Sequence, residues 1–170
     1  MKRSTAAERD ADPTTWRWQA VVAAPFGYVG IRTGSNQVTE VRYLGTKAKR
    51  LDPLDATARE ACAQIAAYLA NPRHHFDVPY ALEGTAFQVS VWRAIAAIAS
   101  GRTRAYGELA TELGTAARAV GGACGSNPVP LIVPCHRVVA AGGRIGGFMH
   151  SRATGPLSIK QWLLRHEGWR

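Results

Sequence analysis

The sequence predicts an α/β protein built from two subdomains. Its first half carries three short runs rich in Val, Ile, Tyr and Trp, separated by glycine-containing turns and followed by one stretch with helical periodicity. Its second half is mostly helical by pattern and holds most of the net positive charge. Hydrophobic residues make up 46% of the 170 residues and charged residues 19%. This composition is typical of a globular protein and excludes a disordered chain.

The first half is predicted to form an antiparallel sheet followed by one helix. The runs at residues 18–24, 27–32 and 38–44 are short and β-prone, and turns containing glycine join them. From about Asp55, apolar residues recur every three or four positions. This pattern predicts an amphipathic helix that ends just before Pro72, because proline cannot continue a helix.

Three segments are expected along the chain. Residues 1–15 are polar and charged, and we expect a flexible tail there. Residues 16–80 are expected to form an N-terminal subdomain, and residues 81–170 a C-terminal domain. The boundary falls in residues 76–83, where Pro79 favours an extended connector.

The C-terminal domain is predicted to open with three helices. Thr85 is a good N-cap with a capping-box glutamine three residues later, which predicts a helix over residues 86–99. A shorter helix is expected at 106–113, and a third, capped by Thr115, at 116–123. Two short helices joined by a glycine-containing turn are typical of a helix-turn-helix motif.

The charge distribution indicates a polyanionic partner for the second half. Residues 86–170 hold 10 basic and only 3 acidic side chains, within a net charge of +9 for the whole chain. Arg118 falls in the first turn of the third helix, where it could reach a nucleic acid, although an exposed solubilising arginine is the alternative. The rest of that helix is mostly Ala and Gly, so it favours contact through shape or the minor groove over base reading.

Several classes of protein are excluded. No run approaches the roughly 18 apolar residues of a membrane helix, and we expect no membrane partner. The three cysteines, Cys62, Cys124 and Cys135, form no CxxC pair and indicate a reducing, cytoplasmic setting. No Cys/His cluster has zinc spacing, so we expect no metal site. His74 and His75 are expected in an exposed loop, and the first two cysteines are expected to be structural.

The residues best suited to catalysis cluster around Cys135. Three prolines within residues 128–134 forbid a helix and hold the chain extended, and the apolar surroundings predict a buried cysteine. Because neighbours in an extended chain point to opposite sides, a bridging water is favoured over a direct bond to His136. Arg137 would help to draw the thiol toward thiolate, and Glu167 is the carboxylate best placed, by elimination, to orient the histidine. An ordinary core cysteine is the alternative interpretation.

These residues resemble a known family. Pro-Cys-His-Arg-Val at residues 134–138 resembles the active-site signature of the O6-alkylguanine-DNA alkyltransferases, also called methylated-DNA–protein-cysteine methyltransferases. Residues 118–123, 127–130 and 160–168 also resemble family segments, in the family order. The resemblance is strong over residues 85–168 and only architectural before them. It implies a ribonuclease H-like N-terminal α/β subdomain, followed by a mainly helical domain with a winged-helix-like helix-turn-helix.

The resemblance also implies a catalytic role for each matching residue. Cys135 would accept the alkyl group, His136 would act as its base through water, and Glu167 would orient His136. Asn127 would brace the active-site turn by hydrogen bonds. Tyr106 would assist base flipping and donate a proton to guanine N3. No cofactor is expected.

The implied partner is double-stranded DNA containing O6-alkylguanine, bound by a protein monomer. Arg118 would enter the base stack from the minor groove and fill the space left by the flipped nucleotide. Further DNA contacts would come from Tyr106, Ala119, Gly122 and Arg137. The alkyl pocket would be formed by Pro130, Val138, Phe148 and Met149.

The residue types suit this chemistry. A thiolate is a soft nucleophile that attacks an sp³ carbon well, and the guanine leaving group departs more easily when a donor protonates it. No nearby group hydrolyses the thioether product. Each molecule should therefore react once, irreversibly and stoichiometrically.

One segment departs from the family pattern. At residues 146–157, Phe148 replaces the usual aromatic hydroxyl, Met149 takes a serine position, and the loop is a few residues longer. The sequence therefore does not determine whether the pocket prefers methyl or bulkier alkyl groups. His150 and Arg152 could contact phosphate, or lie in a solvated loop.

Three other functions compete with alkyl transfer. A non-catalytic sensor of alkylated bases could use the same scaffold, but that class typically carries tryptophan where Cys135 stands. A helix-turn-helix regulator of this kind would need an additional zinc-binding domain. A Cys-His hydrolase would need an oxyanion hole and a directly paired histidine.

Overall fold

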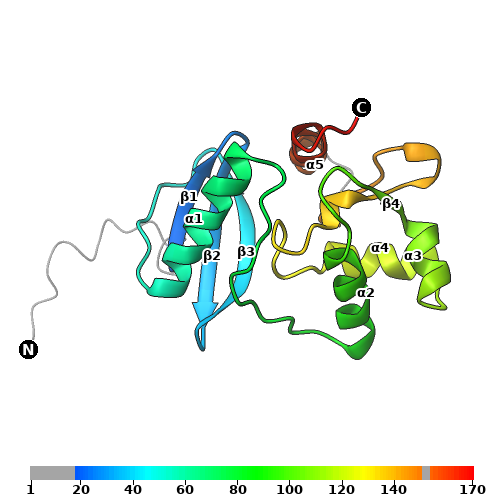
Figure 1. Cartoon of the computed structure of the whole chain (residues 1–170), viewed down its shortest axis with the longest axis horizontal. Coiled ribbons are helices and arrows are strands. Elements are labelled where there is room, and N and C mark those ends of the chain that lie inside the picture. The colour runs from blue at the N-terminus through cyan, green and yellow to red at the C-terminus, as the bar shows by residue number, and fades with distance from the viewer. Residues whose placement is uncertain (1–17, 151–153) are drawn as a thin grey trace, which may run out of the picture.

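The computed structural model describes residues 18–150 and 154–170, so the expected tail at residues 1–15 and the position of Arg152 lie outside the described residues. A sheet and one helix from residues 20–70 lie on one side of the molecule, and three helices from residues 86–125 lie on the other (Figure 1). The C-terminal helix lies at the top of that view, between the two groups. The expected mixed α/β fold is confirmed.

The sheet is an antiparallel meander, as expected. Strands β1 (Ala20–Ala24), β2 (Gly27–Gly34) and β3 (Gln37–Gly45) pair in the order β1-β2-β3. Ser35 and Asn36 form the two-residue turn between β2 and β3, with φ values of 51° and 59°. Positive φ at both turn residues gives the backbone twist that matches paired strands, and the turn places Gly34 opposite Gln37. The register shifts further along, between Arg32 and Thr33.

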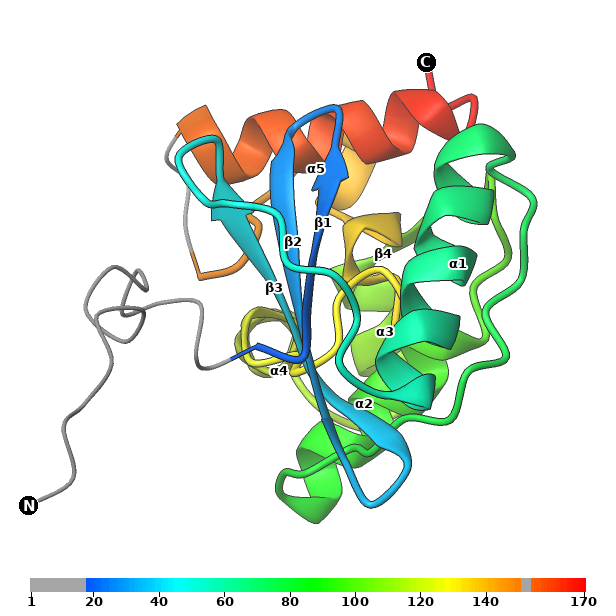
Figure 2. The ribbon, with the colours of Figure 1, turned by 90° about the vertical axis from the view of Figure 1, so that its left-hand side faces the viewer.

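Helix α1 (Ala56–Ala70) lies beside the strands, as Figure 2 shows. It begins where the sequence predicts because the Asp55 carboxylate accepts a hydrogen bond from the backbone N–H of Ala58 at 2.7 Å. The same carboxylate accepts from the Thr33 hydroxyl of β2, which ties the start of the helix to the sheet. Ile65 and Tyr68 are buried on its inner face.

The connector between the two halves is extended and is bonded to β3. The backbone N–H of Val38 donates to the Pro79 carbonyl at 2.8 Å, and Ala81 N–H donates to the Val38 carbonyl at 2.9 Å. Further along the same strand, Val41 N–H donates to the carbonyl of Pro128 at 2.8 Å. The sheet is therefore fixed both to the connector and to the turn that precedes the cysteine.

Helix α2 (Ala86–Ala96) begins with the expected capping box at Thr85. It ends three residues earlier than predicted, because the chain turns and Ile98 N–H bonds the Ile95 carbonyl at 3.0 Å. The Trp92 indole N–H donates to the Ala123 carbonyl at 2.8 Å, which holds this helix against the helix that follows the turn.

Helices α3 (Tyr106–Glu112) and α4 (Ala117–Gly125) form the expected pair joined by a glycine-containing turn. The prediction that Thr115 caps the second of these helices is wrong. The N-cap is Ala116, which makes no side-chain capping bond. Thr115 belongs to the turn, where its N–H donates to the Ala110 carbonyl at 2.9 Å.

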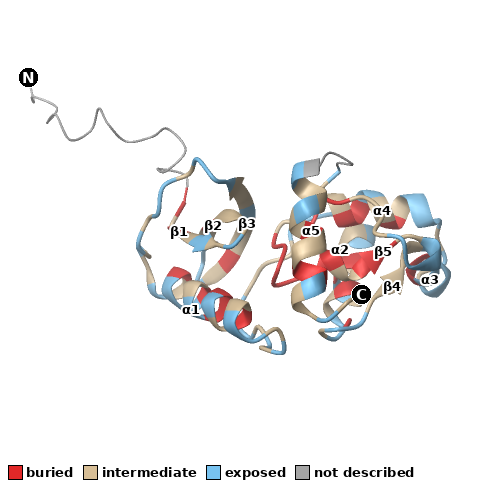
Figure 3. Ribbon diagram, turned by 90° about the horizontal axis from the view of Figure 1, so that it is seen from above, coloured by how far each residue is buried: buried red, intermediate tan, exposed pale blue. Residues whose placement is uncertain are grey.

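The remaining elements complete the second half. Strand β4 (Arg104–Ala105) pairs in parallel with β5 (Val138–Val139), and a single 3₁₀ turn, η4 (Ala141–Gly143), follows. Helix α5 (Thr154–His166) contains Pro156 in its first turn, where proline is tolerated because no amide donor is required there. Buried residues concentrate on the inner sides of the helices and on the segment leading to β5 (Figure 3). Within the described ranges, no helix is long and apolar enough to cross a membrane.

The cap at the start of α1 predicts a measurable loss of stability. Asp55→Ala removes the acceptor for both Ala58 N–H and the Thr33 hydroxyl. We expect the free energy of unfolding to fall by about 1–2 kcal/mol, measured by urea denaturation. Asp52→Ala is the matched control, because Asp52 forms an exposed ion pair with Arg50 and its loss should cost at most about 0.5 kcal/mol. Equal losses in the two variants would contradict the capping role.

Candidate active site

A braced turn presents Cys135. The Asn127 side chain donates from Nδ2 to the Val133 carbonyl at 2.8 Å and accepts from Val129 N–H at 3.0 Å. These two bonds close the turn from inside, where Asn127 is only 5% exposed. Leu131 lies at the tip of the turn with a φ of 74°, a left-handed conformation that the bonds around it hold in place. Asn127, the residue expected to brace the turn, thus lies inside the turn and bonds its backbone at two points.

The backbone at the cysteine is not fully extended, which corrects one prediction. The segment Cys135–Arg137 forms a single 3₁₀ turn, η3. The prolines rule out a continuing α-helix, but Pro134 lies just before this turn, where no amide donor is required. Cys135 and His136 therefore follow each other around a turn.

The Cys135 thiol is almost fully buried, with 3% of the residue exposed. Burial raises the pKa of the thiol, whereas a hydrogen bond from Asn127 and the positive charge of Lys160 act to lower it. At rest, Cys135 is a protonated thiol. Its reactivity depends on a group that takes the proton away.

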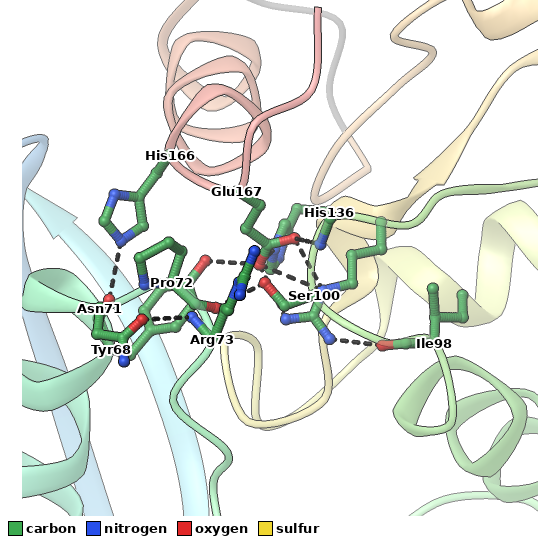
Figure 4. Close-up of polar contacts among 11 residues, drawn as sticks. Tyr68, Asn71, Pro72, Arg73, Ile98, Ser100, His136, His166 and Glu167 are labelled. Atoms are coloured by element: carbon green, nitrogen blue, oxygen red, sulfur yellow. Dashed lines mark hydrogen bonds and ion pairs between the residues drawn. The ribbon is translucent and has the colours of Figure 1, made fainter.

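His136 is bonded to Glu167, as Figure 4 shows. The distance between His136 Nε2 and Glu167 Oε1 is 2.8 Å, and both side chains are 1% exposed. Burial lowers the pKa of His136, although the Glu167 carboxylate acts in the opposite direction, so the imidazole is neutral. Because an ionised carboxylate can only accept, Nε2 carries the proton and Nδ1 is an acceptor. Nδ1 is buried and has no hydrogen-bond partner among the described residues.

Arg137 lies against the same carboxylate, and its side chain is 11% exposed. Its Nε and Nη2 donate to Glu167 at 2.9–3.2 Å, and Nη1 donates to the Ile98 carbonyl. Burial alone would raise the pKa of Glu167, but hydrogen bonds from His136 and Arg137 and their charges lower it to about 2. The guanidinium is bonded to Glu167 and to the Ile98 carbonyl in this structure. The expected contact of Arg137 with DNA stays a prediction.

Lys160 is a site residue that sequence reasoning did not single out. It is 0% exposed, and its Nζ donates to the Val138 carbonyl at 2.6 Å and the Gly147 carbonyl at 2.9 Å. Burial lowers the pKa of the ammonium to about 8. Its position three residues before Leu163 on an amphipathic helix was the available signal, because this spacing places it on the buried face.

A pocket of about 430 Å³ opens beside the thiol. The pocket is lined by small residues of α4 and by larger side chains, among them Tyr106, Arg118, Cys135, Phe148 and Met149. Arg118 is exposed at this pocket, and the Tyr106 hydroxyl donates to the Gly147 carbonyl at 3.2 Å. Burial raises the pKa of Tyr106, so the phenol holds its proton.

Four other predicted residues lie outside the lining of this pocket: Ala119, Gly122, Pro130 and Val138. The first two lie on α4, where Gly122 is exposed and Ala119 is half-buried. The other two are buried around the Cys135 turn. The structure thus gathers the predicted thiol, tyrosine, arginine and loop residues, but it does not bring these four to the pocket wall.

Residues 147–150, which belong to the segment that departs from the family pattern, form one wall of the pocket. Met149 and His150 both have positive φ, 52° and 57°, an unusual conformation for residues with side chains. The His150 ring rests on Gly125, where a Cβ would lie 2.4 Å from it, and its Nε2 lies 3.1 Å from the Ser126 hydroxyl. The wall is therefore fastened to the end of α4.

The remaining candidate residues make no further site. Burial raises the pKa of Cys62 to about 11 and that of Cys124 to about 12, and neither forms a disulfide. His74 packs edge-on against Phe76, whereas His75 is exposed. No group of three or more metal-ligating side chains occurs within residues 18–150 and 154–170.

Comparison with known proteins gives consistent matches. Residues 86–169 match the family model described as 6-O-methylguanine DNA methyltransferase, DNA binding domain. A methylated-DNA–protein-cysteine methyltransferase of Methanosarcina acetivorans is 40% identical over 159 residues, covering 89% of this chain and 98% of that protein. The crystal structure of a Mycobacterium tuberculosis O6-methylguanine methyltransferase is 37% identical and has a TM-score of 0.74. It covers 86% of this chain and 90% of that one.

A second structure from Mycobacterium tuberculosis shows a similar protein in complex with DNA. It is 38% identical, has a TM-score of 0.74, and covers 86% of this chain and 90% of its own. These similarities extend over both halves of the fold, including the sheet that precedes the matched family segment.

The depressed pKa of Glu167 predicts a pH-dependent loss of stability. A carboxylate with a lowered pKa stabilises the fold above its unfolded pKa, and this contribution disappears as pH falls through the folded value. Glu167→Gln lacks this contribution. The wild type should therefore be more stable than the variant by an ionisation contribution of up to about 3 kcal/mol near neutral pH. This difference should shrink as pH falls from about 4.5 toward 2, measured by urea denaturation across that range. A difference that stays constant with pH would show that Glu167 is not preferentially ionised in the fold.

Proposed function

Because this chain belongs to the methylated-DNA–protein-cysteine methyltransferase family, we propose that it transfers the O6-alkyl group of guanine in duplex DNA to its own Cys135. It is a DNA-repair enzyme, and its relatives at 36–50% identity carry the methyltransferase name. The proposal rests on one arrangement. The Cys135 thiol lines an open pocket with Arg118 exposed on it, and the adjacent His136 is bonded to an ionised Glu167.

We further infer the finer architecture. The three-stranded antiparallel sheet with one covering helix supports a ribonuclease H-like N-terminal subdomain over residues 16–80. The pair α3 and α4, with the short strands β4 and β5, supports a winged-helix-like helix-turn-helix within residues 81–170. The second part carries the thiol and the pocket.

The reaction begins with removal of the thiol proton. His136 is neutral, and its buried Nδ1 is the acceptor, while Nε2–H is held by Glu167. The proton passes from Sγ to Nδ1 through one bridging water. The positive charge formed on the imidazole is balanced by the carboxylate, and the charge of Lys160 favours the thiolate.

The thiolate then displaces guanine from the alkyl carbon. A bond forms between Sγ and this carbon, the bond from the carbon to O6 breaks, and its electron pair remains on the guanine. Tyr106 keeps its proton because its pKa is raised, so it is an acid that can protonate guanine N3 as negative charge develops. The hydroxyl exchanges its bond to the Gly147 carbonyl for one to the base.

The product is a thioether on Cys135, and the buried turn offers no group to remove it. Each molecule therefore reacts once, and no cofactor takes part in the step. This single turnover separates alkyl transfer from a Cys-His hydrolase, which would regenerate its thiol.

Recognition of DNA is assigned to the surface around α4. Arg118 is exposed at the pocket, and the small residues of this helix, among them Ala119 and Gly122, allow close approach to a duplex. We propose that the nucleotide flips through the minor groove into the pocket while Arg118 fills its place in the stack. Arg137 positions Glu167 through its hydrogen bonds, and a DNA contact of this arginine remains part of the proposal.

We infer that Lys160 holds one wall of the pocket in position. Its ammonium joins the carbonyls of Val138 and Gly147, which belong to separate segments. Phe148 and Met149 then form the wall that faces the thiol, and Pro130 and Val138 support the turn behind it.

Alkyl transfer predicts a defined change of mass. After mixing with a duplex that contains one O6-methylguanine, the intact protein should gain one methyl group and no more, because the thioether is stable. Cys135→Ser should gain none. Cys62→Ser is the matched control and should react like the wild type, since Cys62 lies outside the pocket. Tight binding of the damaged duplex without any mass gain would instead identify a non-catalytic sensor.

The proposed role of Arg118 predicts a selective defect. Arg118→Ala should slow methyl transfer from duplex DNA by about ten- to a hundredfold, measured in single-turnover experiments. Alkylation of Cys135 by iodoacetamide, which requires no DNA, should be unchanged. Arg59→Ala on α1 removes the same charge from an exposed site in the other half and should leave both rates unaltered. If the two variants lost the same fraction of their methyl-transfer rate, the defect would come from the loss of one positive charge and not from the position of Arg118.

A further inference from the structure

Tyr68 connects the N-terminal half of the protein to the carboxylate behind the thiol. It lies on α1, is 1% exposed, and donates from its hydroxyl to Glu167 Oε1 at 2.8 Å. Its carbonyl accepts from His166 Nε2 at 2.8 Å, and its ring packs edge-on against the His166 ring. Figure 4 shows the Tyr68 and His166 side chains to the left of Glu167.

The two Glu167 oxygens are bonded differently. Oε1 accepts from Tyr68, from His136 Nε2 and from Arg137 Nη2, at 2.8–2.9 Å, and also from Arg137 Nε at 3.2 Å. Oε2 accepts from Arg137 Nε at 3.0 Å and from Gly101 N–H at 3.4 Å. The tyrosine hydroxyl thus shares an oxygen with the histidine. Among the described residues that donate to Glu167, Tyr68 is the one that belongs to the first subdomain.

A donor on Oε1 has two physical effects on His136. It fixes the plane of the carboxylate, and with it the direction in which the imidazole Nε2–H points. It also draws electron density from the oxygen, so the carboxylate pulls less strongly on the histidine proton. Without this donor, Glu167 is more basic, and His136 becomes protonated at a higher pH.

We propose that Tyr68 is a positioning residue for alkyl transfer, which acts from the N-terminal subdomain through Glu167 on His136. This inference rests on the proposed function of Cys135. It assigns a chemical task to the first subdomain, which also reaches the active-site turn through the backbone hydrogen bond from Val41 to Pro128.

The surroundings favour a role for the hydroxyl itself and not only for the ring. Burial and the negative charge of Glu167 both raise the pKa of Tyr68, so the phenol remains a donor over the working pH range. The other charged groups around the network are Arg137, facing Glu167, and Lys160, whose charge lowers the pKa of His136. Removing only the Tyr68 oxygen leaves the charges of Arg137 and Lys160 in place.

The test uses Tyr68→Phe, which keeps the ring and removes the hydroxyl. We expect the single-turnover rate of methyl transfer to fall by about tenfold, the effect of one lost hydrogen bond to a charged group. The acid limb of the pH–rate profile should move to higher pH by roughly half a unit to one unit, because His136 becomes more basic. Tyr80→Phe is the matched control. Tyr80 is a partly buried tyrosine of the connector, and its substitution should change neither the rate nor the profile.

A double-mutant cycle with Glu167→Gln separates positioning from packing. If Tyr68 acts through the carboxylate, Tyr68→Phe should have little further effect on the rate in the Glu167→Gln background. An equal fold-loss in both backgrounds, or a lowered unfolding midpoint with an unchanged pH profile, would overturn the proposal and leave Tyr68 as a packing residue.

A DNA-free readout distinguishes this inference from the proposed function. The rate at which iodoacetamide alkylates Cys135, followed by peptide mass mapping, reports removal of the thiol proton alone. If wild type gains no methyl group from DNA but Tyr68→Phe still shifts the pH dependence of alkylation, the proposed function fails and the positioning role stands. If methyl transfer occurs and Tyr68→Phe leaves both readouts unchanged, only the positioning role fails.

Discussion

Burying the charge of Glu167 costs several kcal/mol unless hydrogen-bond donors surround the carboxylate. The part of the chain that the structure describes supplies five of them. They come from α1, from the turn after α2, and from the 3₁₀ turn that carries the thiol. Each segment is separated from Glu167 by many residues, so the charge is satisfied only when all of them are in place. The same condition that makes the carboxylate tolerable also fixes His136 beside Cys135. Folding and the readiness of the thiol are therefore linked through one side chain.

Local signals allowed much of the fold to be predicted. The cap at Asp55 and the capping box at Thr85 act over three residues, and both helices begin where these residues require. The meander followed from turn glycines and β-prone runs. The errors were local too. Thr115 lies in the turn before α4, and η3 forms after Pro134, because a short turn needs neither a side-chain cap nor the proline amide.

The candidate site was predictable where a motif carried it and not where long-range packing decided it. Cys135, His136 and Glu167 followed from residue type and resemblance. The direction of the Arg137 guanidinium did not, because its partner lies 30 residues away, and the Tyr68 hydroxyl reaches across 99 residues. The charge of Lys160 predicts an exposed position. Its burial could not be predicted, because it depends on hydrogen bonds to the carbonyls of Val138 and Gly147 that only the folded chain brings together.

Lys160 gives the molecule an internal reporter of its own opening. An amine with a pKa near 8 is nucleophilic at neutral pH, yet this one is sealed between two carbonyls and two aromatic rings. Reagents that acylate lysines can reach it only when the wall at Gly147 separates from β5. The labelling rate of this one amine, compared with those of the surface lysines, therefore measures how often the pocket wall detaches in the native state.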